Sequence, residues 1–353
     1  MNYNLKTCPI TLNTTRICGI DPINTAVEIS KIGFSSMKPN AVILVNRSEV
    51  FDGIAASPLV HFPIDAPILF TDGNMLNNET LAEIQRLSPM GYKGIQVILV
   101  GNISRNVALE LNRLGLRTYQ VTGRNHYETA CKIPGERKEF ENILIMSGED
   151  FSEGIVSAFW SAHHGDPILF VQKDSIPSCT LEAIRKMHNI NVYIIGSTKT
   201  VSKAVESALS QLNNINHIVR IDGNTPYDIA INFAEYENPI TKFGWGRNYR
   251  EGHAFTFGTL SNPMAIISGV ILAHMGKHSP LLLIEKDTVP QLVINYLQSI
   301  KPLPSKNMPR PPFMHGFILG DTSQITYNVQ IKIEDTLSIE HKMMGNIDIY
   351  DMA

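Results

Sequence analysis

Cysteine is scarce in this chain of 353 residues, which contains only four. No two of them form a Cys-x-x-Cys pair, and this excludes the ligand spacing of zinc ribbons. Cys8 and Cys18 could form a disulfide if the protein is extracellular. The pattern favours a simpler interpretation, scattered thiols that stay reduced, and no metal site is predicted.

The chain also lacks an excess of one charge and has no long apolar run. Its 30 basic and 33 acidic residues give a net charge of −3, so no nucleic-acid partner is expected. The longest apolar segments are as long as strands, well below the roughly 18 residues of a membrane-spanning helix, so membrane insertion is not expected. The first 15 residues do not resemble a signal peptide, because they contain one lysine and no apolar core. The chain is therefore expected to stay in the cytoplasm, to leave by another export route, or to begin at a mature N-terminus.

Motifs of the common enzyme classes are absent as well. There is no GxxxxGK[ST] phosphate loop, no GxGxxG after a strand, no GxSxG elbow and no HExxH site. His163 and His164 end an expected helix, and His274 and His278 hold a similar place further along the chain. The helix dipole favours histidine at such ends, so these residues are interpreted as structural. No catalytic residue and no cofactor is predicted.

What the chain does contain is one pattern repeated three times. The segments 16–30, 119–133 and 219–234 align without gaps around Gly19, Gly123 and Gly223. Each pattern is followed by a proline before an apolar run, and then by an apolar run that ends in glycine and a polar turn. These residues are Pro67, Pro167 and Pro280, and Gly101, Gly196 and Gly320. Because about 100 residues make a small domain and not a solenoid repeat, three tandem domain-sized units are expected.

The predicted units cover residues 1–118, 119–218 and 219–340, and a tail follows at 341–353. Strand-like and helical runs alternate in each unit, which is typical of an α/β fold. The strand-like runs are apolar throughout, as in strands buried on both faces of a parallel sheet. We therefore predict three tandem Rossmann-like units with mostly parallel sheets, packed as a pseudo-threefold trimer within one chain.

The third unit departs from the other two in two long segments, 235–252 and 301–314. The second contains five prolines and cannot form a helix or a central strand, so both are expected to be surface loops. The first contains Trp245, Arg247, Tyr249 and Arg250. This aromatic and basic loop is predicted to stack on sugars, to dock a partner, or to have no specific role.

Ligands of open parallel sheets bind beyond the carboxyl ends of the strands, where helix N-termini favour anions. Five cationic residues lie just past such strand ends, namely Arg47, Arg105, Lys173, Lys199 and Lys286. They are the candidates for binding an anionic polymer. The alternative is that the polar residues at these ends only cap helices.

In these motifs the repeats resemble the type 2 cell wall-binding repeat of Gram-positive surface proteins. The family unit runs Arg-x-x-Gly-x-Asp-Arg-Tyr-Glu-Thr-Ala, then Asp-Ala-Leu-Ser-Ala-Ala-Pro-Leu, Ala-Pro-Ile-Leu-Leu, and later Ile-Ile-Gly-Gly with a Val-Ser turn. The matching residues, within roughly 16–335, are Arg16 and Gly19, Arg220 and Gly223, Asp52 to Leu59, Ala66 to Phe70, Tyr127 to Ala130, Ile194 to Gly196, and Val201-Ser202. Their order, kept three times, makes the resemblance specific.

The resemblance implies a compact pseudo-trimer of Rossmann-like units on the cell surface. It also implies non-covalent attachment to an anionic cell wall polysaccharide, with no catalysis by the repeats. The shared motif residues are expected to serve the fold, and they are Gly19, Asp52, Pro67, Gly101, Gly123, Tyr127, Glu128, Thr129, Pro167, Gly196, Gly223, Tyr227, Pro280 and Gly320.

Several family positions are altered in this chain. The family Arg before Tyr is replaced in all three repeats, by Pro22, His126 and Pro226, and the later family Asp is Asp52, Glu153 and Met264. If these residues hold polymer, binding is weakened or lost. If they serve the fold, the units have found other packing.

Three functions therefore compete. The first is a wall-binding module that holds an anionic polymer in a salt-sensitive way. The second is a structural protein that reuses the fold to assemble with itself as a lattice, ring or homo-oligomer, which the altered positions and the lack of a signal peptide favour. The third is an enzyme on a Rossmann-like scaffold, which no acid–base pair supports. The polymer's identity, the oligomeric state and the export route do not follow from the sequence.

Overall fold

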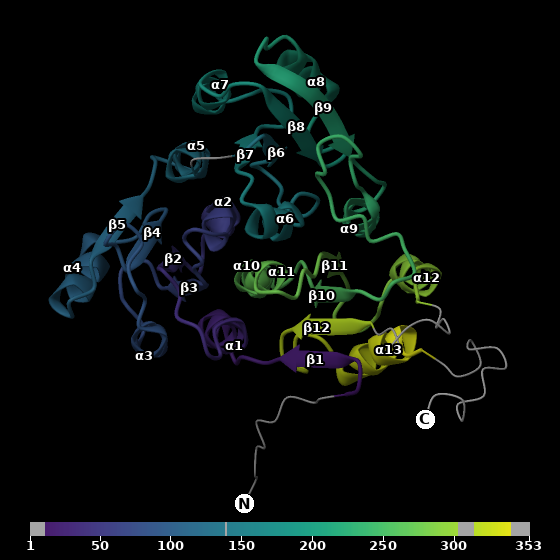
Figure 1. Ribbon diagram of the computed structural model, residues 1–353, viewed down its shortest axis with the longest axis horizontal. Coiled ribbons are helices and arrows are strands. Elements are labelled where there is room, and N and C mark those ends of the chain that lie inside the picture. The colour runs from purple at the N-terminus through teal and green to yellow at the C-terminus, as the bar shows by residue number, and fades with distance from the viewer. Residues whose placement is uncertain (1–10, 138–139, 303–313, 340–353) are drawn as a thin grey trace, which may run out of the picture.

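The three predicted units are visible as three separate four-stranded sheets (Figure 1). The computed structural model describes residues 11–137, 140–302 and 314–339. The predicted tail 341–353 and most of the predicted loop 301–314 lie outside these residues. Every strand pairing within the three sheets is parallel. The expected α/β class with parallel sheets is thus confirmed.

The three sheets have the same spatial order of strands. Across the first sheet run β3 (Ile68–Thr71), β2 (Val42–Asn46), β4 (Val97–Val100) and β5 (Thr118–Val121). Across the second run β7 (Ile168–Val171), β6 (Asn142–Ser147), β8 (Ile190–Ile195) and β9 (Ile215–Ile221). Across the third run β11 (Leu281–Leu283), β10 (Ala254–Gly258), β12 (His315–Leu319) and β1 (Thr14–Ile17).

The helices also fall into equivalent sets. Each repeat opens with α1 (Pro22–Gly33), α5 (His126–Lys132) or α9 (Pro226–Glu235). The helices after β2, β6 and β10 are α2 (Val50–Ala56), α6 (Ser157–His164) and α10 (Pro263–Gly269), which α11 (Ile271–His274) follows. The remaining ones are α3 (Asn78–Leu87), α7 (Ser178–Arg185), α12 (Gln291–Ser299), α4 (Arg105–Arg113), α8 (Lys203–Ser210) and α13 (Tyr327–Leu337). Two 3₁₀ turns, η1 (Ser57–Val60) and η2 (Ile133–Glu136), extend α2 and α5.

Sequence repeats and sheets are offset by one strand. The strand that opens each repeat is the fourth strand of the preceding sheet, so β5 pairs with β4 and β9 pairs with β8. By the same rule β1, from the start of the chain, pairs with β12 of the third repeat. The three repeats are therefore linked in a closed ring. The repeat boundaries at 118/119 and 218/219 stay a prediction from the sequence.

The turn from this fourth strand into the next helix explains the repeated opening pattern. Asp21, Asn125 and Thr225 cap the helices, because each side chain accepts a hydrogen bond from a backbone N–H three residues later, at 2.8, 3.0 and 3.2 Å. The motif glycine stands against the new helix. A Cβ at Gly19 would lie 2.2 Å from the backbone nitrogen of Thr25, and one at Gly123 would lie 2.3 Å from Glu128 Cβ. Only glycine allows this approach.

The repeated prolines begin the hydrogen bonding between two neighbouring strands of each sheet, β3 with β2, β7 with β6 and β11 with β10. The carbonyls of Pro67, Pro167 and Pro280 accept hydrogen bonds from the central strand, at 3.0, 2.9 and 2.9 Å. Because proline has no N–H, it fits just before the second strand, where only its carbonyl is needed.

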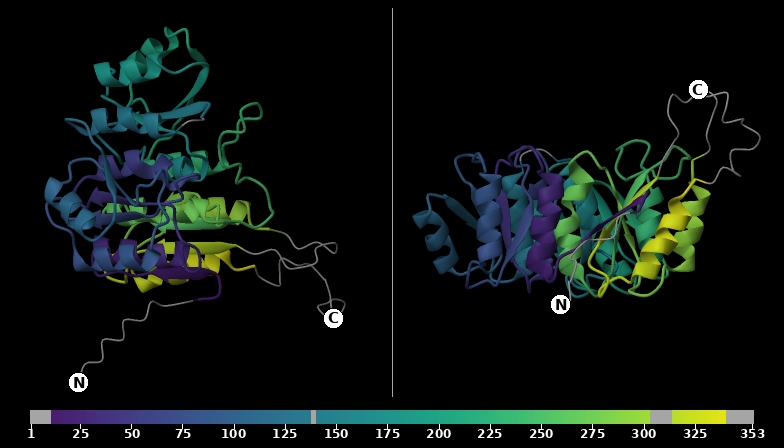
Figure 2. Two further views of the ribbon diagram at one scale, coloured as in Figure 1. Left: turned by 60° about the vertical axis from the view of Figure 1, so that its left-hand side comes forward. Right: turned by 90° about the horizontal axis from the view of Figure 1, so that it is seen from below.

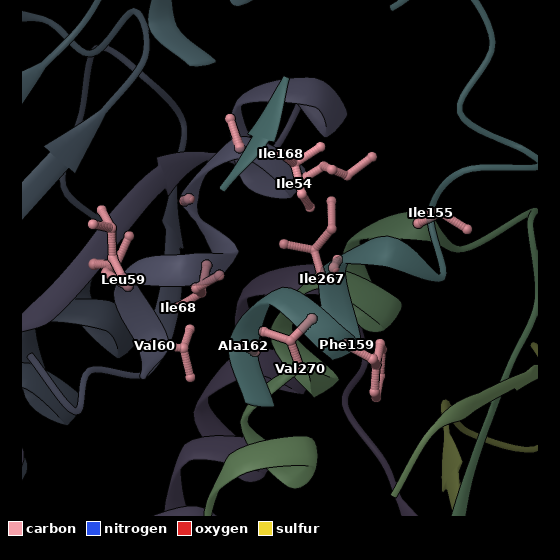
Figure 3. Close-up of a cluster of buried hydrophobic side chains, with 14 of the residues drawn as sticks. Ile54, Leu59, Val60, Ile68, Ile155, Phe159, Ala162, Ile168, Ile267 and Val270 are labelled. Carbon is pink, nitrogen blue, oxygen red and sulfur yellow. The ribbon is translucent and has the colours of Figure 1, made fainter. Parts of the chain in front are cut away.

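The helices α2, α6, α10 and α11 occupy the centre between the three sheets (Figure 1). The close-up in Figure 3 shows their side chains meeting, among them Ile54, Phe159 and Ile267, which are fully buried. A Cβ at Gly53 would lie 2.8 Å from Ile267 Cγ2, so α2 and α10 approach closely. The apolar core therefore runs through all three repeats. Seen from below, the molecule is flattened, with helices standing across its thickness (Figure 2). The pseudo-threefold relation of the units stays a prediction.

The long segment 235–252 lies only partly on the surface, with Ile240 and Tyr249 80% and 57% exposed. It has no helix or strand beyond Glu235, but Phe243 is fully buried and Trp245 is 6% exposed. Phe243 stacks on Tyr193 of the second repeat, with the ring centroids 3.5 Å apart. The expectation of an exposed aromatic loop is therefore wrong for Trp245, and the segment fills the space between the second and third repeats.

Candidate functional site

The five candidate cations lie at the carboxyl ends of strands, distributed over the three sheets. Arg47 follows β2 and forms an ion pair with Asp72, with 2.5 Å between Nε and Oδ1. Arg105 begins α4, and Lys199 donates to the carbonyl of Asn224 at 3.2 Å. Lys173 and Lys286 hold equivalent places after β7 and β11, where their carbonyls accept the N–H groups of Ser202 and Thr326. All five residues are exposed to solvent. None of them is among the residues that line the groove described next.

The altered family positions have structural roles. Pro22 and Pro226 are the first residues of α1 and α9, where a helix accepts proline without losing a hydrogen bond. His126 is the first residue of α5, and its Nε2 lies 3.0 Å from the carbonyl oxygen of Gly148 in the second repeat. Its ring stacks on Phe51 at a centroid distance of 4.6 Å. His126 thus packs the second repeat against the first.

A groove with a volume of about 1390 Å³ runs between the first sheet and the second repeat. The edge strand β5, the helix α5 and the turn η2 form one wall, and α7 forms the other. The groove arises because β5 belongs to the first sheet while α5 already packs on the second. The sequence analysis did not identify it, since only the tertiary structure brings β5 and α7 to the same place.

The groove walls combine cations, carboxylates and aromatic rings. The cations are Arg124, Lys132, Arg137 and Lys186, and the carboxylates are Glu128, Glu136 and Glu182. Tyr119 is 45% exposed and donates to Glu136 Oε1 at 2.9 Å. Arg137 is only 8% exposed, and its Nε has no hydrogen-bond partner among the described residues. Burial lowers the pKa of Arg137, and Asp166 opposes this shift. The groove thus carries charges of both signs beside aromatic rings.

Two thiols also line the groove. Cys131 and Cys179 are free, and burial raises the pKa of Cys131 to about 12, so it stays a thiol. Cys18 is disulfide-bonded, so the expectation of a reduced thiol is wrong for this residue. Cys8 lies outside the described residues.

Among residues 11–137, 140–302 and 314–339, no group of three His, Cys, Asp or Glu side chains could hold a metal ion. In the same ranges, no helix has the length and apolar character that crossing a bilayer requires.

Two curated proteins of Bacillus subtilis (strain 168) are similar to the chain. N-acetylmuramoyl-L-alanine amidase LytC is 30% identical over 229 residues, which is 64% of this chain and 43% of LytC. The amidase enhancer is 27% identical over 325 residues, which is 91% of this chain and 40% of the enhancer. The chain thus spans less than half the length of these relatives.

Two solved structures share the fold. Cwp6 from Clostridium difficile superposes with a TM-score of 0.76 at 20% identity, over 96% of this chain and 50% of Cwp6. Cwp8 from the same organism gives 0.74 at 22% identity, over 93% of this chain and 52% of Cwp8. At such identities the likeness concerns the fold.

The family model for cell wall binding domain 2 (CWB2) matches residues 16–106 and 120–206, the first two of the three repeats. The third repeat lies outside the match, although its sheet has the same strand order. The predicted resemblance is confirmed, and the chain belongs to the cell wall binding domain 2 family.

Proposed function

We propose that this chain is a non-catalytic module that holds an anionic cell wall polymer without covalent attachment. Membership of a cell wall binding family is the observation that carries the proposal. The aligned parts of LytC and the amidase enhancer would then be their wall-binding parts. The altered family positions do not oppose this function, since Pro22, His126 and Pro226 serve helix starts and packing.

We further propose that the polymer lies in the groove between β5 and α7 and reaches the cations at the strand ends. Lys132 and Lys186 are exposed on the two walls of the groove and offer mobile positive charges to a polyanion. Tyr119 and Tyr127 offer flat apolar faces for sugar rings. Binding of this kind is sensitive to salt, because a polyanion releases counterions when a protein neutralises it.

The test is sedimentation of the protein with purified Gram-positive cell walls at increasing salt. We expect binding to the wall and release by salt. Replacing both groove lysines, Lys132→Gln with Lys186→Gln, is expected to weaken binding roughly tenfold, or about 1.4 kcal/mol. A second variant replaces the five strand-end cations Arg47, Arg105, Lys173, Lys199 and Lys286 by glutamine and measures their share.

The matched control is Lys31→Gln with Lys242→Gln, which removes two exposed lysines outside the groove. It is expected to bind as the unchanged protein does. Because Cys179 also lines the groove, bound polymer should slow alkylation of its thiol. Equal loss in the groove and control variants would place the polymer elsewhere, and no salt-sensitive wall binding at all would refute the function.

A further inference from the structure

Histidines stand at the ends of the central helices in all three repeats. His61 directly follows η1, His163 and His164 end α6, and His274 ends α11, with His278 four residues further. We name these five residues the histidine junction. The sequence shows the pairs in the second and third repeats, but only the fold brings His61 to them. Val60, Ala162 and Val270, which precede the junction, lie near one another in Figure 3.

The junction takes part in the contact between each pair of repeats. His274 Nε2 of the third repeat lies 2.9 Å from Asp65 Oδ1 of the first, and its ring centroid is 4.9 Å from that of His61. His163 Nδ1 of the second repeat lies 3.1 Å from the carbonyl oxygen of Ala273 in the third. The third contact is Arg137 of the second repeat, which donates to the carbonyl of Phe62 in the first at 2.7 Å.

The surroundings of the junction disfavour additional positive charge. The pKa of His61 is lowered to about 4, mainly by burial and to a smaller extent by His274, Arg137 and His164, while the backbone of Phe62 acts in the opposite direction. The pKa of His163 is likewise lowered to about 4, mainly by burial and then by His278, with smaller effects of His164 and Arg247. His163 Nδ1 lies 3.4 Å from His278 Nδ1, so two charged rings would repel strongly there. The pKa of His278 is also lowered, by burial and then by Arg247 and His274.

Two carboxylates face the junction and act in the opposite direction. Asp166 Oδ2 lies 3.0 Å from His164 Nδ1 and raises the pKa of His164, against the effects of burial and Arg137 and with help from Glu141. Asp65 is the partner of His274. The charged form is therefore favoured at His164 and opposed at three histidines, His61, His163 and His278.

We propose that the histidine junction is an acid-sensitive lock, which holds the three repeats together when its histidines are neutral and loosens their contacts when they are protonated. In the unfolded chain histidine takes up a proton near pH 6.5. Because His61 and His163 resist protonation in the fold, the stability they contribute is present above pH 6.5 and is lost as the pH falls toward 4. His164 contributes stability that is present below pH 6.5 and lost as the pH rises through its raised pKa.

The chain contains its own reporter of the lock. Its two tryptophans both pack on the junction, since Trp160 stacks on His164 at 5.1 Å and Trp245 on His163 at 4.9 Å between ring centroids. Their rings lie 5.4 Å apart, and both are nearly buried. Tryptophan emission, excited at a wavelength that the tyrosines do not absorb, therefore reports on the junction.

The test follows tryptophan emission and the thermal midpoint of the full chain from pH 8 to pH 4.5. We expect a reversible change in emission below pH 6 and a fall of the midpoint by roughly 5 °C between pH 7.5 and pH 5. In the variant His61→Gln with His163→Gln, most of this fall should disappear. The control is His253→Gln, since burial also lowers the pKa of His253 but its ring is bound to Tyr249, away from the junction.

A fall in the double variant as large as in the unchanged protein would overturn the proposal. If the double variant does not fold, hydrogen exchange of the unchanged protein at pH 5 and pH 7.5, corrected for intrinsic rates, decides the matter. Faster exchange confined to residues 57–65, 161–166 and 271–279 supports the lock, because it marks opening at the junction. Uniform acceleration, or none, refutes it. Neither readout depends on wall binding.

Discussion

The second and third repeats use different side chains to support equivalent loops, the loop after β8 and the loop after β12. In the second repeat Glu153 accepts the N–H of Ser197 at 2.7 Å and the hydroxyls of Ser197 and Thr200 at 2.9 and 2.6 Å. In the third repeat the residue at the place of Glu153 is Met264, whose thioether sulfur is only a weak acceptor. Gln324 accepts the equivalent N–H instead, that of Asp321, at 3.1 Å.

The first repeat keeps the family carboxylate, Asp52, but gives it fewer hydrogen bonds than Glu153 has in the second repeat. Asp52 is 5% exposed and takes hydrogen bonds from Thr129 and from the backbone of Asn102. Its Oδ1 has no partner among the described residues. The three repeats thus keep one requirement, an acceptor for the loop N–H, and meet it in three ways. This helps to explain how the third sheet forms outside the stretch that the family model matches.

The carbonyl of the loop glycine also has a donor in every repeat. The loop glycines directly follow β4, β8 and β12 and have positive φ angles. The angles are 80° at Gly101, 139° at Gly196 and 131° at Gly320. Gln120, Arg220 and Arg16, from the adjoining fourth strands, donate to their carbonyls at 3.0, 2.8 and 3.0 Å. The family arginine therefore ties one repeat to the sheet before it.

The largest effect is expected for Arg16→Ala. Arg16 is buried, donates to Gln330 Oε1 and to several carbonyls of the loop after β12, and holds β1 in the third sheet. Its loss should lower the free energy of unfolding by about 4 kcal/mol, since buried carbonyls lose their donor. Gln120→Ala, at the equivalent place in the first repeat, should cost only about 1 kcal/mol in the same urea titration. Equal losses would contradict the special role of the ring closure.

Asp52→Asn should change how stability depends on pH. Burial, and then Glu49, raises the pKa of Asp52 to about 6. The fold therefore favours the protonated carboxyl of Asp52. The stability that this protonated form contributes is lost as the pH rises from about 4 through 6. The variant should gain about 3 kcal/mol relative to the unchanged protein between pH 4 and pH 7. Urea titrations at both pH values measure this gain, and a constant difference between the two proteins would argue against it.

A smaller difference should separate the second and third repeats. Glu153→Ala leaves the buried N–H of Ser197 without an acceptor and should cost about 2 kcal/mol. Gln324→Ala should cost about 1 kcal/mol, because the loop of the third repeat also rests on Arg16 and on Asp321, which accepts from Ser323 and Gln324. Chemical denaturation measures both.

The same comparison can be sharpened by restoring the carboxylate. Met264→Glu in the Gln324→Ala background should recover part of the lost stability, because the new carboxylate stands where Glu153 stands in the second repeat. Further destabilisation by Met264→Glu would mean that the third repeat has diverged beyond this exchange.

Several parts of the fold could be predicted because they depend on neighbours in the chain. Helix caps at Asp21 and Asn125 and the buried runs of β6 and β8 follow from local composition and spacing. The burial of Trp245 could not be predicted in this way. A segment rich in glycine and arginine is typical of a surface loop. Only the packing of the second repeat against the third buries Phe243 and Trp245 of this segment.

The sequence by itself determined the family, the three repeats and the order of strands and helices within each, since hydrophobic pattern and turn residues act over short distances. Only the tertiary structure decided which sheet each opening strand joins, and with it the groove beside β5 and the closed ring made by β1. It also brought His61, His163 and His274 together from three repeats. The physical reason is that these contacts join residues far apart in the chain, whose meeting depends on how the sheets pack.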